Sequence, residues 1–258
     1  MDLVQATILG IVEGLTEFTP VSSTFHLIWT SRFLGIAEND FVKLFEIVIQ
    51  SGAILAILAL YLDTLRRDRE LDLRLIASFI PTGIVGFLLF RLIRDVFLSN
   101  ATLQLVMFIG IGALFILLEL WLRGRTLKRD AGSLSYVEAV FVGLCQSIAV
   151  IPGVSRAGAV IVGMLLVGVR REEAARYSFL LAVPTIIAAG AYDLYQSRAV
   201  LASSTGGVTA LIVGGVVSFV VALVVVRWLV GYLQRHTLIP FGAYRVIAGA
   251  LLALFGPR

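Results

Sequence analysis

The sequence predicts an all-α integral membrane protein with about six transmembrane helices and two re-entrant helical hairpins. Hydrophobic residues make up 59% of the 258 residues and charged residues only 15%, and the mean hydropathy is +0.97. Such a chain is too apolar for a soluble domain of this size. The apolar residues also fall into long runs, and two shorter runs end in polar clusters beside a proline.

Six runs of about 19–25 residues are long enough to cross a hydrocarbon core about 30 Å thick. They lie at 42–62, 73–93, 101–122, 173–195, 208–232 and 238–256.

The stretches 3–17 and 136–150 are too short to span, because 15 helical residues rise only about 22 Å before Pro20 or Pro152 breaks the helix. Each is followed by another short apolar stretch, 24–34 and 157–168. We expect two hairpins that enter and leave the membrane on the same side, with tips that lie in protein or line a wet cavity.

The two halves of the chain resemble each other weakly. When residue 6 is laid on residue 139, Glu13 meets Gln146, Ser22 meets Ser155 and the two proline-bearing clusters coincide. We therefore predict one membrane domain, 1–258, with repeats at about 1–123 and 134–256. Each repeat would have one hairpin and three spans, and this odd number of crossings inverts the second half relative to the first. In such inverted repeats the functional site lies near the membrane midplane. The alternative is coincidence among glycine, alanine and valine.

The net charge of +4 comes from arginines in short loops and not from a basic stretch with stacking aromatics, so it indicates topology and not nucleic-acid binding. We see no removable signal peptide, and the single Cys145 is interpreted as a core residue. The side of the membrane with more loop arginines and lysines should be cytoplasmic. This leaves both termini and the mouth of the first hairpin outside. The cytoplasmic set is Arg66, Arg67, Arg69, Arg74, Arg123, Arg125, Lys128, Arg129, Arg170, Arg171, Arg176 and Arg235, and the opposite set is Arg32, Lys43, Arg91, Arg94, Arg198 and Arg258.

Two carboxylates in the first cluster are the strongest chemical signal. Glu13 and Glu17 share a helix face and repel each other when both are ionised. At membrane depth they require a proton, an arginine or a divalent cation, and oxygen ligands favour Mg²⁺ or Ca²⁺. One of them could instead act as a general acid or base, and a surface pair near the headgroups is the structural alternative.

The hydroxyl residues Ser22, Ser23 and Thr24 follow Pro20 and open the next short helix. Free N–H groups at a helix start bind anions, although simple capping explains one hydroxyl. His26 lies within one turn of Ser23 and could take its proton or attack phosphorus itself. Otherwise His26 is a hydrogen-bonded packing residue.

The second cluster, Pro152 to Arg156, places an arginine beside a flexible glycine. A guanidinium stays charged at depth and binds phosphate or carboxylate. Arg245, at the start of the last span, is a second candidate cation, unless it extends to the interface. Glu46 and Gln50 line the cavity or cap its mouth, and we give them lower weight.

These residues together resemble the undecaprenyl-diphosphate phosphatase family associated with bacitracin resistance, in order along essentially the whole chain. The motifs are Glu13-x-x-x-Glu17, Pro20-Val-Ser-Ser-Thr with His26, Phe45-Glu46-x-x-Ile49-Gln50, Pro152-Gly-x-Ser155-Arg156, Phe179-Leu-Leu-Ala-Val-Pro184 and Ile239-Pro-Phe-x-x-Tyr-Arg245. The resemblance implies hydrolysis of undecaprenyl diphosphate, a divalent-metal requirement and an inverted repeat. It also implies a site at the outer face of the bacterial inner membrane, where the lipid carrier is recycled for peptidoglycan synthesis.

Carried over by position, the resemblance makes Glu13 and Glu17 the paired acids and Ser23 and His26 the nucleophile or base candidates. Ser155 and Arg156 become the phosphate grip, and Arg245 matches a late arginine. Three positions depart from the family pattern: Phe25 replaces a glycine, and Ala157 and Val160 replace a serine and a threonine.

The interpretation we favour is in-line attack by Ser23 on the terminal phosphorus, with His26 as the base and with Arg156 and a metal neutralising charge. A metal-activated water is the alternative nucleophile. A polyprenyl-phosphate carrier or flippase without hydrolysis is the alternative function, because inverted repeats with broken helices also describe carriers. The sequence leaves the oligomeric state open, including a homo-oligomer.

Overall fold

The protein is described by a computed structural model that covers residues 1–89, 92–97, 100–203 and 206–256. Within these ranges every regular element is helical, apart from one isolated bridge between Arg129 and Val169. The all-α membrane fold is thus confirmed. The helices are α1 (Leu3–Thr16), α2 (Ser23–Phe33), α3 (Asp40–Val48), α4 (Gln50–Arg67), α5 (Arg69–Leu88), η1 (Ile93–Phe97), α7 (Ala101–Trp121), η2 (Ala131–Ser133), α8 (Tyr136–Ser147), η3 (Ile148–Val150), α9 (Arg156–Leu166), α10 (Arg171–Gln196), α11 (Arg198–Ser203), α12 (Gly207–Leu233) and α13 (Ile239–Phe255).

Five of the six predicted spans correspond to helices long and apolar enough to cross a membrane: α3 with α4, then α5, α7, α10 and α12. The sixth, α13, has only 17 residues, near the lower limit for spanning. Part of the predicted span 73–93 lies outside the described residues, at 90–91, and so do the loop cations Arg91 and Arg258.

The two short helix pairs form the predicted helical hairpins. α1 packs on α2, and α8 packs on α9. In each hairpin the chain between the two helices lacks α-helix, and its last residue, Ser22 or Ser155, has a positive φ, 70° or 79°. These are the non-glycine residues with positive φ among the described residues. Such a backbone is costly for residues with a side chain, so tertiary contacts must hold both tips.

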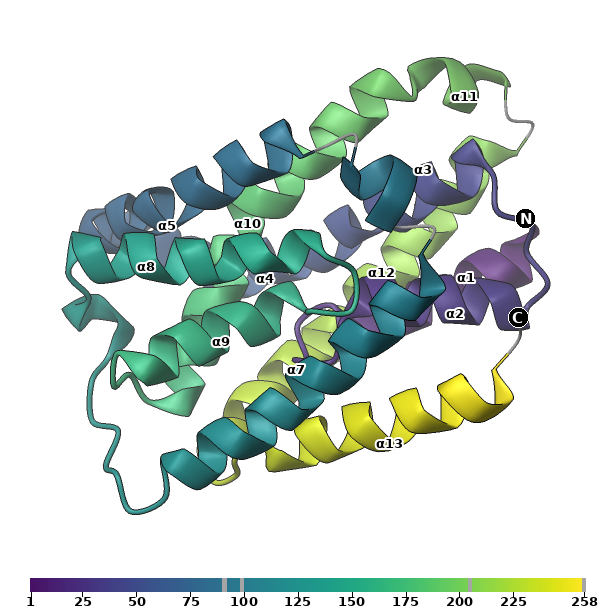
Figure 1. Cartoon of the computed structure of the whole chain (residues 1–258). Helices are drawn as coiled ribbons and strands as arrows, with labels where there is room; N and C mark the ends of the chain where they lie inside the picture. The colour runs from purple at the N-terminus through teal and green to yellow at the C-terminus, as the bar shows by residue number, and fades with distance from the viewer. Residues whose placement is uncertain (90–91, 98–99, 204–205, 257–258) are drawn as a thin grey trace.

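Equivalent elements of the two chain halves make equivalent contacts. α1 of the first half packs on α12 of the second, and α8 of the second half packs on α5 of the first, while α7 packs on α13 (Figure 1). The inverted repeat stays a prediction, and this exchange of hairpin helices favours it. The exchange also brings the two tips together at the centre of the bundle.

Glycines allow the hairpin helices to approach the spans closely. A Cβ atom at Gly143 of α8 would lie 2.1 Å from the carbonyl oxygen of Ser78 on α5. At Gly10 of α1 it would lie 2.6 Å from the carbonyl oxygen of Gly214 on α12. Small residues at such contacts are typical of helix packing in membranes, where close backbone approach supplies much of the attraction.

Candidate active site

The central cluster joins the two hairpin tips through one carboxylate. Ser23 Oγ donates a hydrogen bond to Glu17 Oε2 at 2.5 Å, and Arg156 Nη2 donates to Glu17 Oε1 at 3.1 Å. Arg156 Nη1 also donates to the carbonyl oxygen of Ser178 at 2.9 Å. Glu17 and Ser23 are buried, so the ion pair and the hydroxyl bond are shielded from water. The structure therefore brings together three of the predicted residues from both halves.

A cavity of about 180 Å³ opens on this cluster. The starts of α2 and α9 border it through Ser22, Ser23 and Thr24 from one tip and Ser155 and Arg156 from the other. Ser155 Oγ accepts a hydrogen bond from the Gly158 N–H and so caps α9, whereas the Ser22 side chain makes no capping bond. Two helix starts with hydroxyls and one arginine form a site suited to a phosphate group.

Glu13 lies one helical turn before Glu17 and is fully buried. Within the described residues neither of its carboxylate oxygens has a hydrogen-bond partner. Glu13 interacts electrostatically with three charged side chains, those of Glu17, Arg156 and Glu46. A buried acceptor without a donor is costly, so this position suits a proton or a bound cation.

The predicted divalent metal fits this position only in part. The unpartnered oxygens of Glu13, next to Glu17, are the hard ligands that Mg²⁺ and Ca²⁺ prefer. However, the described residues contain no group of three His, Cys, Asp or Glu side chains placed to hold a metal. Two carboxylates would therefore need further oxygen ligands from substrate or water.

The predicted pairing of His26 with Ser23 is not what the structure contains. His26 Nδ1 is 2.8 Å from the Ser22 carbonyl oxygen, and Nε2 is 2.7 Å from the Tyr244 hydroxyl on α13. Both ring nitrogens are thus engaged, and Ser23 bonds Glu17 instead. His26 is not among the residues that line the cavity, so the geometry favours Glu17 as the group that receives the Ser23 proton.

Arg245 also differs from its prediction as a phosphate ligand or an interfacial cation. Its side chain is fully buried, and it is absent from the lining of this cavity. It donates hydrogen bonds to the backbone carbonyls of Phe108, Pro20 and Gly153. Arg245 is thus buried next to both tips, where it connects three backbone segments through hydrogen bonds.

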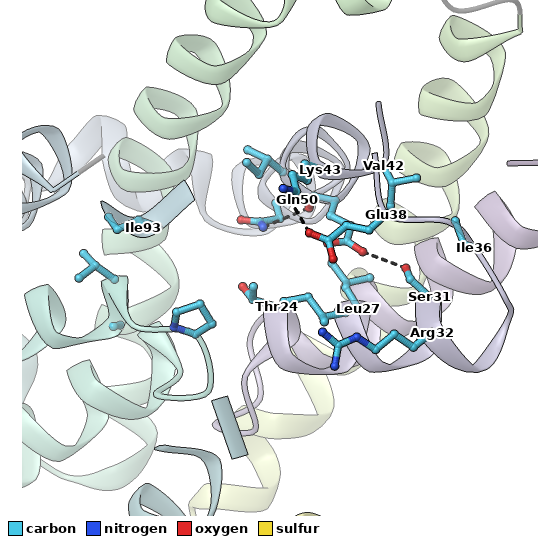
Figure 2. A pocket seen from close by; sticks show the side chains of 16 residues that line it. Thr24, Leu27, Ser31, Arg32, Ile36, Glu38, Val42, Lys43, Gln50 and Ile93 are labelled. Carbon is cyan, nitrogen blue, oxygen red and sulfur yellow. Dashed lines mark hydrogen bonds and ion pairs between the residues drawn. The ribbon is translucent and has the colours of Figure 1, made fainter. Parts of the chain in front are cut away.

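A second cavity, of about 240 Å³, adjoins the first and shares with it a wall formed by Thr24, Gln50 and the 149–152 segment. Figure 2 shows Gln50 and Thr24 facing each other across it. Glu46 accepts a hydrogen bond from Ser31 Oγ at 2.9 Å and lines this second cavity. Glu46 and Gln50 therefore line a cavity, which is the first of the two alternatives considered for them.

Sequence reasoning missed Thr82 and Thr185, and it treated Gln146 only as the counterpart of Glu13. All three line the first cavity. Gln146 Nε2 donates to Thr82 Oγ1 at 2.9 Å and to Thr185 Oγ1 at 3.4 Å. The threonines lie inside long spans without a local motif, so only tertiary packing identifies them.

The three departures from the family pattern lie away from the cavity wall. Phe25 is buried and stacks on Phe108, with ring centroids 3.9 Å apart. Ala157 and Val160 are buried on the packed side of α9. The lost hydroxyls therefore do not remove a lining group from the cavity.

The fold and the site together define a multi-pass helical membrane protein with a buried polar site suited to phosphate where two broken hairpins meet. The family model described as "Bacitracin resistance protein BacA" matches residues 6–251. The chain belongs to this family.

Relatives from several organisms agree with this assignment. The chain is 46% identical over 251 residues to a protein named "Undecaprenyl-diphosphatase" in Aquifex aeolicus, covering 97% of both chains. It is 42% identical over 258 residues to one in Campylobacter fetus, covering 99% of both. A relative with the same name in Thermus thermophilus is 42% identical over 254 residues, covering 97% of this chain and 96% of its own.

Proposed function

We propose that this protein hydrolyses undecaprenyl diphosphate to undecaprenyl phosphate and inorganic phosphate, and so recycles the lipid carrier for cell-wall synthesis. Family membership and the activity named for its relatives support this function. The observation that carries the chemistry is the buried cluster in which Glu17 binds both Ser23 and Arg156. A hydroxyl, a carboxylate acceptor and a guanidinium beside one cavity can supply a nucleophile, a proton acceptor and charge stabilisation for phosphoryl transfer.

In the first step Ser23 Oγ passes its proton to Glu17 and attacks the terminal phosphorus. The bond from that phosphorus to the bridging oxygen breaks, and undecaprenyl phosphate leaves with the electron pair. Arg156 and the N–H groups at the starts of α2 and α9 stabilise the phosphoryl oxygens. In the second step water hydrolyses the phosphoserine, which releases inorganic phosphate and restores the Ser23 hydroxyl.

Glu13 and Glu17 would hold the divalent ion, for which Mg²⁺ and Ca²⁺ are our candidates. A bound ion would neutralise diphosphate charge, as metals do in phosphoryl transfer. The unpartnered oxygens of the buried Glu13 support this assignment. Metal-activated water remains the alternative nucleophile.

We also propose that the site faces the outer side of the bacterial inner membrane. The segments 63–74, 123–135 and 170–176 carry most of the arginines, and arginine-rich segments at the ends of spans are retained in the cytoplasm. α1 begins and α13 ends at the opposite end of the bundle from the 122–135 loop (Figure 1), which supports outward termini.

The test is phosphate release from a C15 or C55 isoprenyl diphosphate by the purified protein in detergent, with Mg²⁺ or Ca²⁺ and then with EDTA. We expect metal-dependent release that falls by about 100-fold or more in Glu17→Ala and Arg156→Ala. Ser23→Ala should be equally impaired, and fast quench should trap phosphoserine in the wild type. Absence of release from the wild type would favour the carrier without hydrolysis.

A further inference from the structure

One buried arginine on α13 touches both hairpin tips. Arg245 Nε donates to the carbonyl oxygen of Phe108 on α7 at 3.0 Å, and Nη1 donates to that of Pro20 at 3.2 Å. Nη2 donates to the carbonyl oxygen of Gly153 in the other tip. A single guanidinium therefore joins three segments that lie far apart in the sequence.

The charge of Arg245 is accommodated by aromatic rings. Its guanidinium carbon lies 4.6 Å from the ring centroid of Phe108 and 5.4 Å from that of Phe115. Phe108 in turn stacks on Phe25 of α2. Cation–π contacts gain strength when they are desolvated, so the residue is placed to hold backbone rather than to reach a ligand.

The tips need such support because their backbone is strained. Ser22 lies two residues after Pro20 and has a φ of 70°. Ser155 lies two residues after Gly153 and has a φ of 79°. Conformations of this kind persist only where the surroundings fix them.

The two tips carry different parts of the reacting cluster. Ser23 comes directly after the first tip. Arg156 comes directly after the second tip, three residues after Gly153. Their separation therefore depends on how the tips are joined. Apart from the Glu17–Arg156 ion pair, Arg245 is a direct link between them.

We propose that Arg245 is a positioning residue that fixes the two tips relative to each other and so sets the spacing of Ser23 and Arg156. The inference rests on the proposed function, because that function gives the spacing its importance. Lysine cannot replace it, since one ammonium lacks the planar set of donors that reaches three carbonyls. Misplacement of reacting groups by about 1 Å can lower the rate about 100-fold.

The kinetic test compares Arg245→Ala and Arg245→Lys with a matched control, Arg129→Lys. Arg129 also donates to backbone carbonyls, those of Ser133 and Val167, but it lies in the loop before α8. We expect kcat for a C15 isoprenyl diphosphate to fall about 100-fold in both Arg245 variants with KM changed less than threefold, and kcat to stay near wild type in the control. Low millimolar guanidinium should restore part of the activity of Arg245→Ala.

A direct phosphate contact would give a different pattern. It would raise KM, and the inhibition constant of inorganic pyrophosphate, as strongly in Arg245→Ala as in Arg156→Ala. That result would overturn the proposal, and so would a kcat within threefold of wild type. If Arg245→Ala does not elute as a monodisperse protein, Arg245→Lys alone decides.

Hydrogen–deuterium exchange separates this inference from the proposed function, because it needs no turnover. Peptides covering residues 18–24 and 150–156 should both exchange at least tenfold faster in Arg245→Lys than in wild type, and neither should change in Arg129→Lys. Unchanged exchange at both tips would reject the positioning role even if the wild type hydrolyses diphosphate. A wild type without hydrolysis but with faster exchange in the variant would count against the proposed function alone.

Discussion

At the scale of single residues, the geometry distinguishes two serine–base pairs that sequence spacing allows. Ser23 and His26 are three residues apart, yet the histidine is bound to the Ser22 carbonyl and the Tyr244 hydroxyl. Glu17, six residues before Ser23, accepts a hydrogen bond from the Ser23 hydroxyl because the tip folds back on itself. Chain reversal at Pro20 therefore decides the partner, and helical periodicity does not.

The pH profile of kcat tests which residue is the base. If His26 accepts the proton, His26→Gln should remove one titration from the pH profile. With Glu17 as acceptor, we expect His26→Gln to lower kcat uniformly, with the shape of the profile kept between pH 5 and 8. Tyr244→Phe is the control, since it removes one hydrogen bond to His26 and should cost less than tenfold.

At the scale of elements, the glycine contacts determine how closely the hairpin helices approach the spans. We expect Gly143→Ala to lower the unfolding free energy by about 1–3 kcal/mol, because the new methyl group would overlap the Ser78 carbonyl. Gly110→Ala on α7 is the matched control: its Cβ has nothing within 4 Å, so it should be neutral or stabilise by up to about 1 kcal/mol. Thermal unfolding in one detergent measures both, and equal stability of the two variants would contradict the close packing of α5 and α8.

An ion pair fixes the loop that precedes α8. Arg129 Nη1 lies 2.6 Å from Glu138 Oε1, and this hydrogen bond, with that from the Ser135 N–H, lowers the pKa of Glu138 from 4.5 to about 2. A lowered pKa in the folded state stabilises the protein above pH 4.5, and this stabilisation is lost as the pH falls towards 2. The gain is modest, because both side chains are partly exposed.

Glu138→Gln should therefore have a lower apparent Tm than wild type at pH 7, by a few degrees. The difference should shrink as the pH falls from 4.5 towards 2, because the Glu138 carboxylate of the unfolded chain takes up a proton in this range before that of the folded protein does. Thermal scans across this pH range provide the measurement. A difference that is constant with pH would show that the ion pair does not stabilise the fold.

At the scale of the whole molecule, orientation is open to direct measurement. In a Cys145→Ala background, we expect Asp2→Cys to react with a membrane-impermeant maleimide in intact spheroplasts. Arg125→Cys should react only after the membrane is permeabilised, because its loop carries the arginine excess. The reverse pattern would place the arginine-rich loops outside and contradict the outward-facing site.

The sequence by itself determined the class of protein, the two helical hairpins and the family. Apolar run length and prolines predict which segments span and which turn back, and these depend on local residues alone. The motifs around Glu17, Ser23 and Arg156 were recognised without coordinates, and the match of the family model to residues 6–251 agrees with the family that they indicated.

Only the tertiary structure decided which of these side chains meet. It pairs Ser23 with Glu17 and buries Arg245 on the tip carbonyls. It also brings Thr82 and Thr185, from separate spans, to the cavity wall. The physical reason is that broken helices leave backbone carbonyls and strained turns whose partners come from distant segments. Sequence spacing cannot specify contacts that depend on how two halves of the chain pack together.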